Sequence, residues 1–320
     1  MAALTGTKSY IFEQNVPFSS CHASTLALLS NGDRIAAWFG GTCEGDPDVD
    51  IWISRCHKDA WSGPVKVAEE EGLPHWNPVF FKADNGIVYL FYKVGHTFSE
   101  WYTRVIVSDD DGHTWSPPKE LVHGDRGGRG PVRNKPVILQ NGAWVAPASL
   151  EREAWEAFVD ISLDQGETWK SSEMVPSRIT REPGKGVIQP TLWESAPNHV
   201  HMLLRSTEGF VYRSDSSDGG KSWCEAYATS LPNNNSGIDL ARTAEGALAL
   251  VHNPVGDNWG PRTPLVVSLS ENEGITWKQA LVLEEGEGEF SYPAIISANG
   301  KLYITYTWNR KTIAYWELTM

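Results

Sequence analysis

Short apolar runs separated by polar, glycine-containing turns extend along the whole chain. Runs of about five to nine residues match the length of β-strands and are shorter than most helices. One series opens each repeat and occupies residues 21–28, 76–81, 134–139, 188–193, 236–241 and 291–296. A second apolar run follows each of these, at residues 34–41, 87–95, 143–151, 199–207, 247–255 and 302–310. The pattern predicts an all-β chain made of repeated antiparallel strands.

Tryptophan recurs with a fixed spacing inside a short motif. The segments SDDDGHTW, SLDQGETW, SSDGGKSW and SENEGITW end at Trp115, Trp169, Trp223 and Trp277, which are 54 residues apart. The same step backwards reaches Trp61, at the end of the degraded copy SRCHKDAW. A fixed period of this length is typical of repeat architectures in which each copy is one supersecondary unit.

The residues of the motif suit a tight turn. An acidic side chain can accept hydrogen bonds from backbone N–H groups, and glycine allows the positive φ that such turns need. We therefore expect a structural role for the polar residues at the third position of the four motifs, which are Asp110, Asp164, Asp218 and Asn272.

The motif resembles the Asp-box of the sialidase-like (BNR repeat) β-propellers, and the resemblance runs over nearly the whole chain. It implies a six-bladed β-propeller of four-stranded antiparallel blades, formed by residues 1–320 as a single domain. Only five tryptophans lie on the period, so the last blade needs another strand. The N-terminal segment KSYIFEQ (8–14) is expected to close it, which would remove an open sheet edge.

Composition and charge exclude several classes of binding partner and cofactor. The formal net charge of −13 argues against nucleic acid and anionic membranes as ligands. No apolar stretch is long enough to span a membrane, and the N-terminus lacks the pattern of a signal peptide, so a cytoplasmic location is expected. Cys21, Cys43, Cys56 and Cys224 show no CxxC spacing, so we expect free thiols, no zinc site and no metal or other cofactor.

Propeller blades are antiparallel meanders, so the start of the first strand and the end of the second lie at the same end of each blade. Side chains at these places should converge on one face, where a pocket is expected. From the starts of first strands the expected site residues are His22, Trp76, Asn77, Lys135, Gln189 and Tyr292. From the ends of second strands, and the third strand of the fifth blade, they are Glu44, Asp48, Arg205, Arg262, Trp308 and Arg310. Several cations gathered in an acidic protein indicate an anionic group in the ligand, because guanidinium groups bind carboxylates bidentately.

The sialidase resemblance also implies a catalytic set. Sialidases bind the substrate carboxylate with three arginines, and Arg205 and Arg262 match two of these in spacing and blade order. The sequence His22-Ala23-Ser24 stands where the family places the first arginine. A protonated His22 could still face an anion there.

The remaining catalytic groups match less closely. The acid/base of sialidases is an aspartate, for which Glu44 is the nearest counterpart by position and Asp48 is a rival. Gln189 stands where a glutamate would activate the tyrosine nucleophile, and that tyrosine falls near Phe290 or Tyr292.

Four functions remain open from these residues. In an exo-acting glycoside hydrolase for a terminal acidic sugar (sialic or uronic acid type), Glu44 would protonate the leaving oxygen and Tyr292 or water would attack the anomeric carbon. In that hydrolase, the residues expected to bind the carboxylate or the sugar are Arg205, Arg262, Lys135, Asn77, Trp76, Arg310 and Trp308.

The first alternative is a polysaccharide lyase that cleaves next to a uronic acid, as some related propellers do. His22 would move the proton, and the cations would stabilise the developing enolate. A second alternative is a glycan-binding propeller without catalysis. The third is an arabinan-cleaving propeller with carboxylates among Glu44, Glu151 and Glu194.

Overall fold

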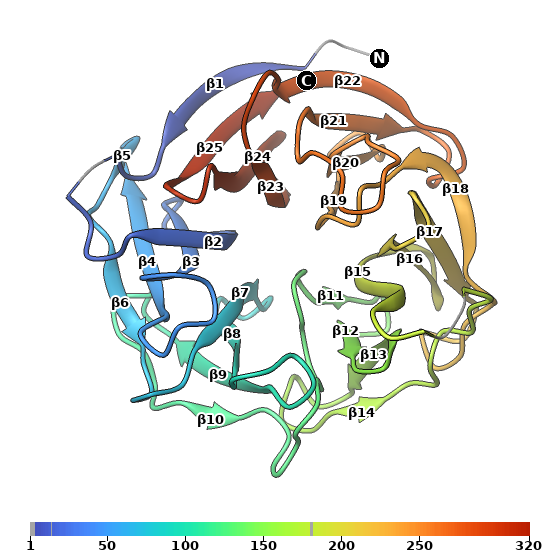
Figure 1. The fold of residues 1–320 in the computed structure, drawn as a ribbon, viewed down its shortest axis with the longest axis horizontal. Coiled ribbons are helices and arrows are strands. Elements are labelled where there is room, and N and C mark those ends of the chain that lie inside the picture. Colours follow the sequence, from blue (N-terminus) through green and yellow to red (C-terminus); the bar gives the residue numbers. More distant parts are fainter. Residues whose placement is uncertain (1–3, 14, 180–181) are drawn as a thin grey trace.

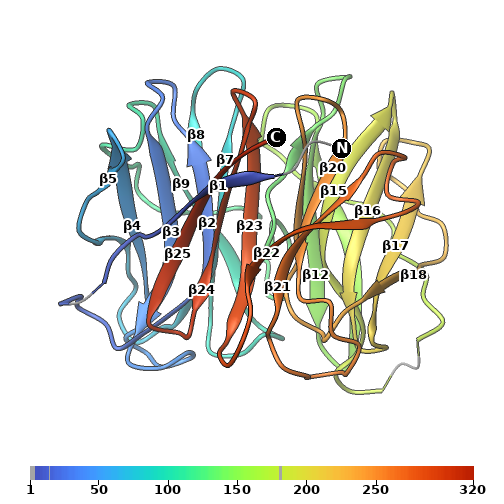
Figure 2. The same cartoon turned by 90° about the horizontal axis from the view of Figure 1, so that it is seen from above.

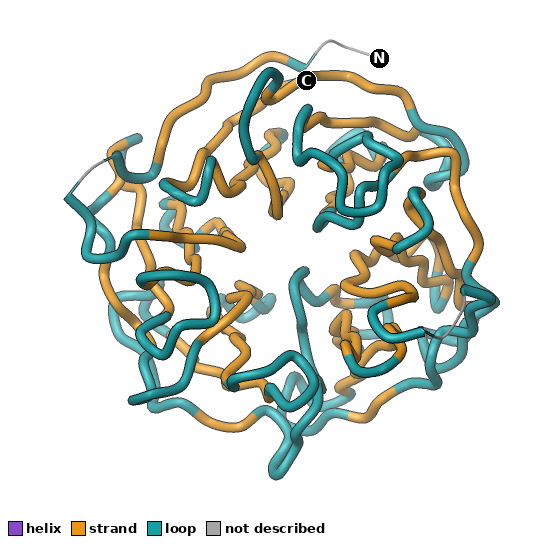
Figure 3. The backbone as a smooth tube through the Cα atoms, in the orientation of Figure 1, coloured by secondary structure: helices purple, strands orange, loops and turns teal. Residues whose placement is uncertain are grey.

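The computed structural model describes residues 4–13, 15–179 and 182–320, and these residues form β-strands with no helix among them (Figure 3). This confirms the all-β prediction. Gln14, the last residue of the expected closing segment, and residues 1–3 lie outside the described residues. Within the described part of the chain, no helix could cross a membrane.

The strands form antiparallel sheets arranged in a ring around a central axis (Figure 1). Seen from the side, most of the long strands run roughly along this axis, so their ends gather at two opposite faces (Figure 2). The first sheet contains β2 (Ser20–Leu28), β3 (Arg34–Gly41), β4 (Asp50–His57) and β5 (Ala60–Trp61), with β6 (Val65–Ala68) paired to β4. The second contains β7 (His75–Lys82), β8 (Val88–Val94), β9 (Tyr102–Ser108) and β10 (Lys119–Glu120).

Two further meanders are joined into one eight-stranded sheet. They are β11 (Val137–Ile138), β12 (Trp144–Glu151), β13 (Ala154–Ser162) and β14 (Lys170–Ser171), then β15 (Lys185–Ala196), β16 (His199–Ser206), β17 (Phe210–Ser216) and β18 (Tyr227–Pro232). The link is a short parallel pairing of Ala154 and Trp155 in β13 with Lys185 and Gly186 in β15. All other pairings in this sheet are antiparallel.

The remaining strands form two four-stranded sheets. One contains β19 (Asp239–Arg242), β20 (Leu248–His252), β21 (Leu265–Ser270) and β22 (Lys278–Glu284). The other contains β23 (Phe290–Ala298), β24 (Lys301–Trp308), β25 (Thr312–Thr319) and β1 (Thr5–Tyr10). Because β1 pairs antiparallel with β25, from Thr5 opposite Thr319 to Tyr10 opposite Ala314, the two ends of the described chain share one sheet.

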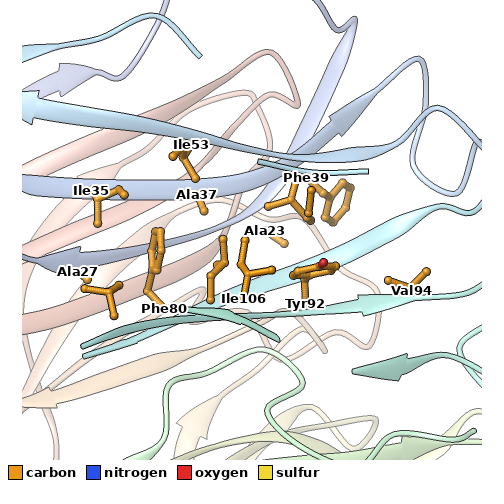
Figure 4. Close-up of a cluster of buried hydrophobic side chains, with 14 of the residues drawn as sticks. Ala23, Ala27, Ile35, Ala37, Phe39, Ile53, Phe80, Tyr92, Val94 and Ile106 are labelled. Carbon is orange, nitrogen blue, oxygen red and sulfur yellow. The ribbon is translucent and has the colours of Figure 1, made fainter. Parts of the chain in front are cut away.

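Neighbouring sheets pack face to face through apolar side chains. Between the first two sheets, Ile35 and Phe39 of β3 lie in one buried cluster with Phe80 of β7 and Tyr92 of β8 (Figure 4). Burying a side chain of this size stabilises the fold by about 1.5–3 kcal/mol. This packing fixes the angle between sheets and therefore the position of the strand ends at the axis.

The repeated turns at the end of the third strands are held by their polar residues. Asp164 accepts hydrogen bonds from the backbone N–H (2.9 Å) and the hydroxyl (2.5 Å) of Thr168. Asp110 and Asp218 make the same contacts with Thr114 and Ser222. In the fourth copy the side-chain carbonyl of Asn272 accepts from the N–H of Thr276 at 2.9 Å. These turns lie between β9 and β10, β13 and β14, β17 and β18, and β21 and β22.

Candidate functional site

The inner strands of four sheets are interrupted by a bulge at the same place. The antiparallel register shifts between His22 and Thr25, Trp76 and Val79, Ile188 and Thr191, and Ser291 and Ala294. Inside each shift one residue has a positive φ between 43° and 55°, and these residues are Ala23, Asn77, Gln189 and Tyr292. Such a backbone costs on the order of 1–3 kcal/mol at a residue other than glycine, and it is found where a side chain must be aimed at a site.

Three of the four bulged residues are followed by proline, at Pro78, Pro190 and Pro293. Proline has no N–H to offer a sheet, so the residue after the bulge adds no unpaired donor where the ladder is interrupted. The side chains of Asn77, Gln189 and Tyr292 all line one cavity at the axis. Ala23 is the fourth member and has no polar group to contribute.

This cavity has a volume of about 270 Å³. Its lining residues come from every meander in the ring and are Glu44, Trp76, Asn77, Phe98, Trp101, Glu151, Trp155, Gln189, Arg205, Trp259, Arg262, Tyr292 and Arg310. Eight of the expected site residues are therefore brought together, namely Glu44, Trp76, Asn77, Gln189, Arg205, Arg262, Tyr292 and Arg310.

Three arginines face the cavity, and each is oriented by hydrogen bonds. Arg205, at the end of β16, donates from Nε to Asn235 Oδ1 at 2.9 Å and from Nη2 to the Asn235 carbonyl. Arg262 and Arg310 both donate to Oε1 of Glu289, at 2.7 and 2.8 Å. One carboxylate thus holds two guanidinium groups side by side, and their charge lowers the pKa of Glu289 although burial works in the opposite direction.

Tyr292 stands between cations. Its phenol oxygen accepts a hydrogen bond from Arg205 Nη1 at 2.8 Å, and its ring centroid lies 5.3 Å from Cζ of Arg262. Arg133, which the sequence analysis did not single out, is buried behind the ring and donates to the backbone carbonyls of Tyr292 and Pro293, the latter at 2.8 Å. Arg133 therefore holds the bulge that presents the phenol.

His22 lies under this site and does not line the cavity. Its imidazole is buried, its ring centroid is 4.2 Å from that of Tyr292, and its Nδ1 lies 2.8 Å from the hydroxyl of Thr307. Burial, together with the charges of Arg310 and Arg262, lowers the pKa of His22 well below its usual value. His22 therefore lies outside the lining of the cavity, and its surroundings favour the neutral imidazole over the cation that could face an anion.

The four expected carboxylates, Glu44, Asp48, Glu151 and Glu194, have different surroundings. Glu44 is partly exposed and pairs with Arg310 Nη1 at 2.6 Å. Asp48 lies outside the cavity, where it accepts hydrogen bonds from the hydroxyl and N–H of Thr42, which lower its pKa. Glu194 also lies elsewhere, because it accepts from the backbone N–H groups of Gln140 and Asn198 at 2.8 and 3.0 Å.

Glu151 closes the wall of the cavity next to Gln189. Its Oε1 accepts a hydrogen bond from Gln189 Nε2 at 3.0 Å. Burial raises the pKa of Glu151, against the opposing charges of Arg205 and Lys93.

Two further expected site residues are placed elsewhere. The Lys135 ammonium group donates to both oxygens of Asp239, at 2.8 and 2.9 Å, and to the Leu240 carbonyl. It borders a second cavity of about 670 Å³ together with Trp193 and Ser195, not the first one. Trp308 packs against Tyr10 and Phe290 and does not reach the first cavity either.

Aromatic side chains that the sequence analysis missed form two walls of the cavity. Phe98 and Trp101 follow β8 and pack on Trp76. The ring centroid of Trp76 lies 5.0 Å from that of Phe98 and 6.2 Å from that of Trp101. In a second group, the ring centroids of Trp155 and Trp259 lie 6.2 Å apart, and Arg205 Cζ lies 5.8 and 5.9 Å from them. The sequence signal that could have identified these four aromatic residues is their position after, or next to, the second strand of a repeat. Within the described ranges, no group of three or more His, Cys, Asp or Glu could hold a metal ion, and the four cysteines are free.

Comparison with known proteins gives one family and many similar folds. A family model described as a BNR repeat-like domain matches residues 32–304. A sialidase from Clostridium perfringens is 30% identical over 102 residues, which cover 26% of this chain and 26% of that protein. The match thus spans about a quarter of the curated relative.

Among solved structures, a Hadza microbial sialidase is 17% identical with a TM-score of 0.78, covering 93% of this chain and 65% of that one. The Trypanosoma rangeli sialidase in complex with sialic acid is 15% identical with a TM-score of 0.74, covering 100% and 59%. A protein of unknown function from Dyadobacter fermentans is 16% identical with a TM-score of 0.79, covering 100% of both chains. At these identities the likeness is one of fold.

Proposed function

Because the chain belongs to the BNR repeat-like domain family within the sialidase-like superfamily, we propose that it is an exo-acting glycoside hydrolase for a terminal acidic sugar. The observation that carries this proposal is the cavity in which Arg205, Arg262 and Arg310 surround Tyr292. Guanidinium groups bind carboxylates by paired hydrogen bonds, which suits a sialic or uronic acid.

We further propose that the ring has six blades. The two meanders β11–β14 and β15–β18 would then count as separate blades linked by the short parallel pairing of β13 with β15. The sheet that contains β1 and β25 would be the blade closed by the N-terminal strand. In this arrangement each blade supplies a strand end to the cavity.

The size of the cavity supports exo action. About 270 Å³ lies at the lower end of the range for small-molecule pockets and suits one sugar residue. The aromatic walls offer apolar faces on which a pyranose ring can stack. The Trypanosoma rangeli sialidase, in complex with sialic acid, has the same fold, which favours an acidic monosaccharide as the bound unit.

The chemistry follows from the orientation of the side chains. The arginines would fix the carboxylate and place the anomeric carbon next to the phenol oxygen of Tyr292. A carboxyl group of the cavity would protonate the leaving oxygen, and Glu44 and Glu151 are both positioned for it. Tyrosine nucleophiles are an established exception to the two-carboxylate scheme of glycosidases.

A lyase is the second candidate, favoured by one observation. In a tyrosine-based hydrolase a carboxylate is needed to take the phenol proton of Tyr292, but the residue at that place in the cavity is Gln189. The imidazole of His22, whose pKa is lowered, lies against the ring of Tyr292 instead. In a lyase the arginines would stabilise the enolate formed at a uronic acid.

One screen separates these functions. Oligosaccharides that end in sialic or uronic acids are incubated with the protein, and reducing ends and ultraviolet absorbance are followed together. A hydrolase releases the terminal sugar without a chromophore, whereas a lyase produces an unsaturated uronate that absorbs. Recovery of every sugar unchanged, with calorimetric binding of one of them, would replace both by a glycan-binding function.

A further inference from the structure

Glu151 is connected to the nucleophile candidate by a chain of side-chain hydrogen bonds. Its Oε1 accepts from Gln189 Nε2 at 3.0 Å, and Gln189 Oε1 accepts from Arg205 Nη1 at 3.1 Å. The same Nη1 donates to the phenol oxygen of Tyr292 at 2.8 Å. The carboxyl group of Glu151 is therefore held in a fixed position on the wall of the cavity that also contains the phenol.

The two carboxyl groups of the cavity differ in their partners. Glu44 is bound directly to the guanidinium of Arg310 at 2.6 Å, and its side chain is 36% exposed. Glu151 instead has an amide as its hydrogen-bond partner, and no cation lies within ion-pair distance of it in the described part of the chain. An ion pair keeps a carboxylate ionised. At the half-buried Glu151 no ion pair does so, and the N–H that Gln189 donates favours the ionised form less strongly than burial favours the protonated acid.

The charged groups around Glu151 do not cancel the effect of burial on its pKa. Burial raises the pKa of Glu151 and has the largest effect, although the charge of Arg205, the hydrogen bond from Gln189 and the charge of Lys93 all favour the ionised form. Lys93 is itself fully buried, which lowers its pKa to about 8. A general acid has to carry its proton at the working pH, and buried carboxyl groups of other glycosidases are tuned in this way.

We propose that Glu151, and not Glu44, is the general acid of this site, while Glu44 positions Arg310. This assignment rests on the proposed hydrolase function. The O–H of Glu151 gives its proton to the glycosidic oxygen as the bond from that oxygen to the anomeric carbon breaks, and the electron pair of the bond stays on the oxygen. The phenol oxygen of Tyr292, after losing its proton to solvent water, forms the new bond to the anomeric carbon.

The second half of the reaction restores both groups. A water molecule attacks the anomeric carbon and displaces the tyrosine oxygen, which leaves as a phenoxide and takes back from solvent the proton that it lost in the first half. The Glu151 carboxylate takes one proton from that water, so that the sugar leaves with a hydroxyl group and the acid is regenerated. Atoms and charge balance without a metal or a redox partner.

Leaving-group dependence tests the assignment. Two substrates with the same terminal acidic sugar are compared, a disaccharide with a sugar leaving group and a 4-nitrophenyl glycoside, whose leaving group needs no proton. Glu151→Gln keeps the acceptor for Gln189, so the fold should be retained. Because kcat/KM reports the steps up to cleavage of the glycosidic bond, we expect kcat/KM on the disaccharide to fall by about 100-fold or more, kcat/KM on the nitrophenyl glycoside to change far less, and the alkaline limb of the kcat/KM pH profile to disappear.

Two matched variants complete the experiment. Glu44→Gln should raise KM for both substrates through Arg310 and keep the alkaline limb. Glu153→Gln, an exposed residue two positions from Glu151, should behave as the wild type. Infrared spectra provide a readout besides activity, since the wild type at neutral pH should show a protonated carboxyl band that Glu151→Gln alone removes.

The contrary results are distinguishable. An active wild type in which Glu44→Gln, and not Glu151→Gln, shows the leaving-group dependence would overturn the role of Glu151 and leave the hydrolase function standing. A wild type without activity on either substrate or on any acidic glycan would overturn the hydrolase function itself. Absence of the carboxyl band from the wild type would also contradict a protonated Glu151.

Discussion

Arg205 donates a hydrogen bond from Nη1 to the phenol oxygen of Tyr292 at 2.8 Å, although the two residues lie 87 positions apart in the chain. The contact exists because β16 ends at the axis and the bulge in β23 turns Tyr292 toward the same point. It joins a residue suited to a substrate carboxylate to the candidate nucleophile. Negative charge on the phenol oxygen would be paired with the guanidinium at the moment a bond forms.

Removing the phenol oxygen should therefore stop the reaction and spare the fold. Tyr292→Phe keeps the ring against His22 and Arg262, so the thermal unfolding midpoint should change little. We expect kcat for hydrolysis to fall by at least about 100-fold with a smaller change in KM. Steady-state kinetics on a glycan with a terminal acidic sugar measures this, and full activity of the variant would exclude Tyr292 as the nucleophile.

Arg310 should act mainly on ligand affinity. It reaches the cavity from the turn between β24 and β25 and shares Glu289 with Arg262. Arg310→Ala removes one charge-assisted partner of the substrate carboxylate, which is worth about 1.5–3 kcal/mol, or roughly 10- to 150-fold in affinity. Calorimetric titration with the acidic monosaccharide checks the value. Unchanged affinity would mean that the carboxylate is bound elsewhere.

His252 should make stability depend on pH. The side chain is buried, with Nε2 3.0 Å from the hydroxyl of Ser268, and burial lowers its pKa to about 4. In the unfolded chain histidine titrates near pH 6.5, so the unfolded state binds more protons between about pH 6.5 and 4, and stability falls as the pH is lowered through this range.

The loss attributable to His252 is at most about 3 kcal/mol by pH 4. Urea denaturation at several pH values should give a smaller slope for His252→Gln than for the wild type over this window. The remaining slope would include the contribution of His22, whose pKa is also lowered. Equal slopes for the variant and the wild type would show that His252 is not the group responsible.

The repeated turns should affect stability without affecting catalysis. Asp164 holds its turn through Thr168, and these hydrogen bonds lower its pKa to about 2. Asp164→Ala should lower the thermal unfolding midpoint at neutral pH and leave kcat and KM unchanged. A selective loss of activity in a variant with an unchanged midpoint would point to a functional role for the turn.

The features that could be predicted from the sequence are those determined by residues close together in the chain or in neighbouring strands. A turn closed by Asp164 and Thr168 is encoded within five residues, so its repetition is visible as a period. The proximity of Gln189 and Arg205 follows from antiparallel strand order, which places the start of β15 beside the end of β16. These features need no knowledge of distant partners.

The errors concern side chains whose state depends on a distant partner. Lys135 was expected to bind substrate, but Asp239, 104 positions away, takes its ammonium group. His22 was considered as a cation, but burial and the charges of four nearby arginines lower its pKa, and its Nδ1 contacts Thr307, 285 positions away. Glu151 was visible only as one of several carboxylates, because its environment depends on Gln189 and Arg205.

The most direct test of the proposed function compares one pair of glycans. One ends in an acidic sugar, and its partner carries the same sugar with the carboxyl group reduced to a primary alcohol. With Arg205, Arg262 and Arg310 around the cavity, kcat/KM for release of the acidic sugar should exceed that for the reduced one by about 100-fold or more. Equal release of the two sugars, or release of neither, would contradict an arginine-lined site for a terminal acidic sugar.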